Sequence, residues 1–128
     1  MITSGESANI VYGIVSEGLG LPVSQAGNDK SHSNVPHVVV HPHKQERGKQ
    51  YMKNFVEANV VIPDIDGEAQ SGLLKSYEKE VQNLFYGDVV GEQNGTAYVI
   101  ELKSLGIEQD SALNSHYVNC KILFSVLR

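Results

Sequence analysis

The sequence has a single cysteine, Cys120, no tryptophan and only four prolines among its 128 residues. One cysteine cannot form an intrachain disulfide, which excludes a disulfide-stapled secreted scaffold. No window approaches 18 uninterrupted apolar residues, so we expect no membrane span. Residues 1–13 lack the basic and apolar segments of a signal peptide, so we expect a protein made and used in a cytoplasm.

Charge and composition bound the function further. The net charge of -5 argues against direct nucleic-acid readout, which usually requires a basic face. The apolar content of 41% is ordinary for a soluble globular protein, and the length fits a single domain over residues 1–128. Four of the ten basic residues lie between Lys44 and Lys53, in a segment that we interpret as a solvated turn.

Hydrophobic periodicity predicts two helices and four strands. Thr3 and Glu6 have the spacing of a capping box, and a 3.6-residue apolar stripe follows until Gly18, Gly20 and Pro22 end the helix. The remaining elements are predicted at Val35–His41 (strand), Tyr51–Ile62 (strand), Glu68–Tyr86 (helix), Ala97–Leu105 (strand) and His116–Leu127 (strand).

This order predicts the α+β class, with the sequence of elements α-β-β-α-β-β. We expect one four-stranded mixed sheet with both helices packed on one face and a right-handed crossover in the middle. Polar residues 24–34 predict a mobile loop, and the strand connections at about 42–54 and 104–115 predict two hairpin arms.

Four of the five histidines, His32, His37, His41 and His43, lie within twelve residues. Alternation on a strand would place His37, His41 and His43 on one side, where imidazoles could bind zinc. Against this, Pro42 interrupts the pair, and no carboxylate or cysteine follows at a usual ligand spacing. We therefore favour a strand in which Val38 and Val40 face the core, and keep the metal site as the alternative.

Other motifs are incomplete. The stretch "PDIDGE" (residues 63–68) has two aspartates at calcium-loop spacing but lacks the remaining ligands, so we expect a turn in which Asp64 or Asp66 caps the following helix. There is no G-x-S-x-G, no P-loop and no G-x-G-x-x-G. We identify no catalytic residue and no cofactor, and expect a protein that is not an enzyme.

The chain resembles the tail-completion, or tail-terminator, proteins of long-tailed bacteriophages and prophages. The resemblance lies in the order of a leading helix, "VPHVVV", a hairpin into "FVEANVVIP", the amphipathic "SGLLKSYEKEVQNLFY" and a last strand "YVNCKILFSVL". It implies a homo-oligomeric ring, a hexamer in that family, that caps the tail tube and joins it to the head-tail connector protein. The implied location is the host cytoplasm during assembly and then the virion tail.

From exposure and length, not from the family, we expect the two arms to carry the oligomer or partner contacts. The candidate residues are Lys44, Arg47, Lys49, Tyr51, Leu105, Ile107 and Leu113. The alternative function is a small metal-binding protein or metal-dependent enzyme that uses His37, His41 and His43. An adaptor domain encoded by the host is a third reading that the sequence leaves open.

Overall fold

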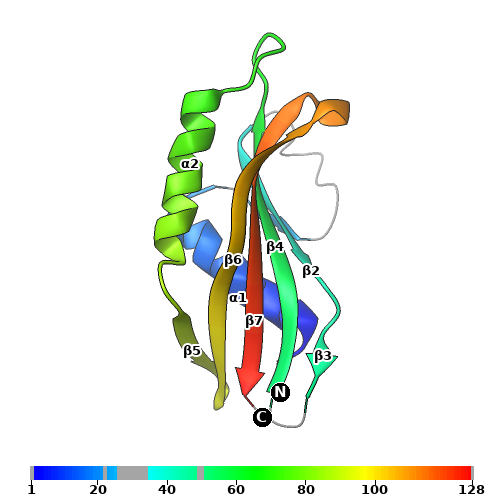
Figure 1. Ribbon diagram of the computed structural model, residues 1–128, viewed down its shortest axis with the longest axis vertical. Coiled ribbons are helices and arrows are strands. Elements are labelled where there is room, and N and C mark those ends of the chain that lie inside the picture. Colours follow the sequence, from blue (N-terminus) through cyan, green and yellow to red (C-terminus); the bar gives the residue numbers. More distant parts are fainter. Residues whose placement is uncertain (1, 22, 26–34, 49–50, 128) are drawn as a thin grey trace.

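The computed structural model describes residues 2–21, 23–25, 35–48 and 51–127, with the backbone alone for 23–25 and Leu113. None of the helices in these ranges is long and apolar enough to span a membrane. The elements, labelled in Figure 1 where space allows, are α1 (Ser4–Leu19), β1 (Val23–Gln25), β2 (His37–Pro42), β3 (Glu46–Arg47), β4 (Tyr51–Pro63), α2 (Ser71–Leu84), β5 (Val89–Gln93), β6 (Thr96–Asp110), the 3-10 turn η2 (Ser111–Leu113) and β7 (Ser115–Leu127).

One curled sheet contains all seven of these strands. Its order is β1-β2-β4-β7-β6-β5, and β3 pairs with β4 beside β2. Among the described strands only β1 and β2 pair in parallel; the other pairings are antiparallel. Figure 1 shows β4, β6 and β7 running along most of the long axis, with β3 and β5 near one end and the β6–β7 hairpin bending away at the other.

The prediction of a four-stranded sheet in the order α-β-β-α-β-β is wrong. The sheet has three further strands. Two of them, β1 and β3, escaped prediction because they are only three and two residues long and carry no readable alternation. The third, β5, precedes the turn Asn94–Gly95, whose positive φ angles of 50° and 82° join β5 to β6. Such a turn favours a hairpin with strands on both sides, so the sequence did hold a signal for β5.

The predicted middle crossover also takes another form. Helix α2 leads from β4 to the β5–β6 hairpin, and β7 lies between β4 and β6. Both neighbours of β7 are therefore antiparallel to it, and no parallel pair forms at this point. Segment 104–110, expected to be part of a connecting arm, is the second half of β6.

Helix α1 begins and ends where the sequence predicts. The Thr3 side chain accepts a hydrogen bond from the Glu6 backbone N–H, and the Glu6 carboxylate accepts one from the Thr3 backbone N–H. Gly20 ends the helix in the left-handed conformation, with φ of 64°. At the N-terminal end of α1, the buried residues Ser7 and Asn54 join the helix to β4, since the Asn54 amide donates to Ser7 Oγ at 3.0 Å.

The core lies between the helices and one face of the sheet. Alternating residues of the two longest central pairings point into it, as the period-2 pattern predicts. Fully buried side chains contribute about 1.5–3 kcal/mol each relative to exposure. Those from the strands include Val38, Val40, Val56, Val60, Ile62, Ile100, Val118, Ile122, Phe124 and Val126, and those from the helices include Val11, Val15, Leu74 and Val81.

Two glycines of α1 make a matched test of this packing. A Cβ added at Gly18 would overlap the Leu84 side chain of α2, whereas a Cβ at Gly13 meets no atom within 4 Å. We expect Gly13→Ala to raise the free energy of unfolding by about 0.5–1 kcal/mol, because alanine has less backbone entropy to lose. Gly18→Ala should gain less than this or lower stability, since Leu84 must move. Urea unfolding of both variants compares them, and equal stabilisation would contradict the predicted contact between the helices.

Candidate functional site

The face of the sheet opposite the core, here called the outer face, carries His37, His41 and His43 and most of the strand-borne polar residues. Partners in antiparallel strands share a face, so register places side chains in rows across β2, β4, β7 and β6. One row holds Glu57 and Lys121, and the next holds Asn59 and Asn119. His41 extends the first of these rows on β2.

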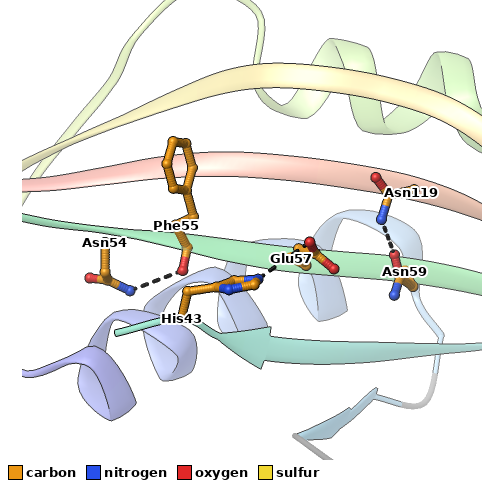
Figure 2. Close-up of polar contacts among 6 residues, drawn as sticks. All are labelled: His43, Asn54, Phe55, Glu57, Asn59 and Asn119. Carbon is orange, nitrogen blue, oxygen red and sulfur yellow. Dashed lines mark hydrogen bonds and ion pairs between the residues drawn. The ribbon is translucent and has the colours of Figure 1, made fainter. Parts of the chain in front are cut away.

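His43 and Glu57 form the most polar contact at the β2 end of the outer face. His43 Nε2 lies 3.3 Å from Glu57 Oε1, and Figure 2 shows the two side chains directed toward each other. The backbone N–H of His43 donates to the Phe55 carbonyl at 2.9 Å, so pairing with β4 continues past Pro42. The His41 ring meets the His43 ring edge-on, with centroids 5.4 Å apart.

Further contacts continue across the centre of this face. The Asn119 amide donates to Asn59 Oδ1 at 2.8 Å across the β4–β7 pair (Figure 2). Lys121 Nζ lies 4.4 Å from the centre of the Phe55 ring, a cation–π contact. Phe55 is also one of the exposed large hydrophobic residues, at 36%. The outer face is thus a surface of the curled sheet whose polar groups contact one another and which retains an exposed aromatic ring.

The structure separates the histidines that the sequence suggested as metal ligands. His37 is 8% exposed, and its Nδ1 donates to the Val35 carbonyl at 2.9 Å. His41 and His43 are exposed; His41 lies within β2 near its other end, and His43 follows Pro42, the last residue of the strand. His32 lies outside the described residues. Within the described ranges, no three His, Cys, Asp or Glu side chains are placed to hold a metal ion.

Much of the first predicted arm, 42–54, belongs to the strands of the sheet. Arg47 belongs to β3 and pairs with Met52, while Lys44 precedes β3 and is exposed. Tyr51 begins β4, pairs with Leu127 and is 44% exposed. Lys49 lies outside the described residues. Of the mobile loop predicted over residues 24–34, residues 24 and 25 belong to β1, and residues 26–34 lie outside the described residues.

The second predicted arm, 104–115, is the end of the β6–β7 hairpin. Leu102 pairs with Ile122 and Ser104 with Lys121, so Lys103 is the extra residue of a β-bulge. Leu105 and Ile107 follow it, partly packed and 39% exposed respectively. Leu113 ends η2, and its side chain is not among those described.

Strand β6 loses its second neighbour just before the bulge at Lys103. Strand β5 pairs only with residues 96–100 of β6. From Lys103 to Gln109, β7 is the sole strand that pairs with β6 in the described part of the chain. Residues 103, 104, 107, 108 and 109 are exposed, so this edge is open along most of its length. We call residues 103–109 the free edge of β6.

A side-chain hydrogen bond that the sequence did not indicate joins the turn end of this hairpin to the segment that follows β4. His116 Nδ1 lies 2.8 Å from Asp64 Oδ1, and the side chains are only 20% and 9% exposed. The Asp64 backbone N–H also donates to the Asn114 carbonyl at 2.9 Å. The prediction that Asp64 or Asp66 caps the following helix is wrong. The N-cap of α2 is Gln70, and Asp66 occupies a turn with φ of 52°.

Glu108 and Tyr117 form a second contact of this hairpin on the outer face. The Tyr117 hydroxyl hydrogen-bonds to the Glu108 carboxylate, which raises the pKa of the phenol because the bond favours its protonated form. Burial adds to the rise, and so do the negative charges of Glu108, Asp110 and Glu57. Three carboxylates therefore surround one phenol where the hairpin leaves the sheet.

Comparisons with known proteins bear on the fold and not on the activity. No protein-family model matches the chain, and no curated protein matches it. Among solved structures 18 chains match. One has a TM-score of 0.62 at 15% sequence identity, and the alignment covers 94% of this chain and 95% of that chain. Its title states no function, and at this identity the likeness shows a shared fold alone.

Cys120 lies in the middle of β7 and is completely buried. Burial raises the pKa of its thiol to about 12, so almost no thiolate forms near neutral pH. We expect Cys120 in the folded protein to resist a thiol reagent and to react fully in denaturant, as measured by the absorbance of the released chromophore. Rapid labelling of the folded chain, with its circular dichroism unchanged, would contradict the burial of β7.

The Tyr117–Glu108 contact predicts a local pH dependence. The folded-state pKa of Tyr117 is raised above the ordinary value near 10, so this contact stabilises the fold below that pH and is lost as pH rises through the folded pKa. Glu108→Gln should lower the Tyr117 pKa, because it removes the negative acceptor. NMR titration of the tyrosine ring carbons measures the shift, and Tyr117→Phe identifies the signal. An unchanged Tyr117 pKa in Glu108→Gln would show that the contact is absent in solution.

Proposed function

We propose that this protein is a structural assembly subunit that resembles phage tail terminators. In this proposal copies of the chain close into a ring, the ring caps a tail tube, and its other side meets the head-tail connector protein. It would assemble in the host cytoplasm and remain in the virion tail. The observation that carries the proposal is the free edge of β6.

A strand edge with open N–H and C=O groups is a ready template for another strand. The free edge of β6 begins at a bulge and carries the exposed Ile107. A subunit that offers one edge and receives another elsewhere makes head-to-tail contacts, which close into rings when the rotation between copies closes. This surface therefore suits a ring-forming subunit.

The ionisable groups of the described residues favour binding over catalysis. His43 contacts Glu57, His116 contacts Asp64, and Tyr117 contacts Glu108. Each of these contacts crosses between two segments of the sheet and so helps to fix the surface. A face whose side chains are already held by such contacts can bind a protein partner without a large loss of conformational entropy.

The test is to measure the mass of the purified protein by light scattering over a range of concentrations, and then to add tail tube protein and image the mixture by electron microscopy. We expect a closed oligomer and a single cap at one end of each tube, with tubes of shorter mean length. Protein that stays monomeric at high concentration, with or without tubes, would overturn the proposal.

The role of the free edge has its own matched pair of variants. Ile107→Lys places a charge on the free edge, whereas Val90→Lys places one on β5 at a site that is 72% exposed. We expect Ile107→Lys to weaken self-association roughly tenfold or more, which is about 1.4 kcal/mol per tenfold step, and Val90→Lys to leave it unchanged. Thermal unfolding checks that both variants fold. Equal association of the two variants would exclude the free edge as the contact.

A further inference from the structure

One end of the molecule is acidic. Residues 63–72 and 104–116 carry five carboxylates and no lysine or arginine. The two segments lie together, since Pro63 pairs with Ser115 and Asp64 contacts His116. The exposed carboxylates include Asp66, Glu68 and Glu108. We call these two segments the acidic end; it includes residues 104–109 of the free edge of β6.

A different edge of the sheet is basic. The described residues 41–48 and 51–53 carry three lysine or arginine residues and one glutamate. Lys44 and Arg47 are exposed, and no carboxylate in the described ranges forms an ion pair with either. Strand β1 pairs with β2 only as far as Val40, so His41 and Pro42 pair with β4 alone among the described strands. We call residues 41–48 and 51–53 the basic edge.

The acidic end and the basic edge lie far apart on one copy. In Figure 1, β3 is near the bottom of the view, and the β6–β7 hairpin and the 63–70 connection are at the top. Opposite charges at opposite ends cannot neutralise each other within one chain, but they can do so between copies. The contact would join two different surfaces and is therefore head-to-tail.

We infer that the acidic end of one copy docks against the basic edge of a second copy, and that this contact links the subunits of the ring. The inference rests on the proposed function, and it names the surfaces that meet there. Charge complementarity selects a second copy as the occupant, because the acidic end carries five carboxylates and the basic edge has an excess of two positive charges. The free edge of β6 would then lie inside the contact.

Paired charge reversals test this contact. Glu68→Lys with Glu108→Lys changes the exposed charge of the acidic end from −3 (Asp66, Glu68 and Glu108) to +1. Lys44→Glu with Arg47→Glu changes the exposed charge of the basic edge from +1 (Lys44 and Arg47 with Glu46) to −3. Each double variant alone should remain monomeric where the wild type assembles, because like charges meet at every contact. Matched controls on exposed sites elsewhere are Lys75→Glu with Lys79→Glu, and Glu80→Lys with Glu92→Lys. These controls should assemble as the wild type does.

Mixing the two double variants gives the decisive measurement. In an alternating ring every contact joins opposite charges again, so the mixture should assemble in a one-to-one ratio, which native mass spectrometry detects. Assembly of the wild type should also weaken as salt is raised, because exposed charges are screened.

Each remaining outcome separates the two proposals. If the wild type assembles and either double variant assembles equally well, the ring stands but the inferred contact is wrong. If neither double variant assembles and their mixture fails as well, with both folded by circular dichroism, the charges do not meet each other and the inference is also wrong. If the wild type itself never assembles, the proposed function fails.

Discussion

Thirteen consecutive residue pairs join β4 to β7, and the rest of the structure depends on this pairing. It fixes which side chains enter the core, because a slip of one residue would turn Val118, Cys120 and Ile122 to the outer face. The same register sets the rows on the opposite side, where Asn59 meets Asn119 and Glu57 lies beside Lys121. Core and candidate surface are thus two consequences of one set of backbone hydrogen bonds.

The sequence was informative where a local rule acts alone. The capping box of Thr3 and Glu6 sets the start of α1, and the glycine at position 20 sets its end. Both signals were readable in the sequence. The alternation in Tyr51–Pro63 and Ser115–Leu127 was also readable, because both strands bury one side only. Even so, these elements did not reveal the sheet order, which depends on contacts between distant segments.

The candidate surface was harder to predict, since it depends on strand register and on the lack of a second paired strand beside part of β6. His37 and His41 share a strand, yet one is buried and the other exposed, a difference that no spacing rule contains. The Asp64–His116 pair joins residues 52 positions apart, and the preference of aspartate for helix caps pointed elsewhere. The free edge of β6 follows from the short length of β5, which no apolar pattern shows, and from a bulge, which shifts the alternation from Ile100 and Leu102 to Leu105 and Ile107.

The position of β7 has a consequence for how the chain reaches its native state. This strand comes after β4 and β6 in the sequence but lies between them in the sheet. Until it arrives, β4 and β6 have no common neighbour, and each exposes an apolar edge that could pair with another molecule. Most sheet contacts are therefore long-range, which favours slow folding with a late, cooperative closing step. A ribosome-bound chain would hold an open gap at the centre of its sheet until this last strand is free to enter.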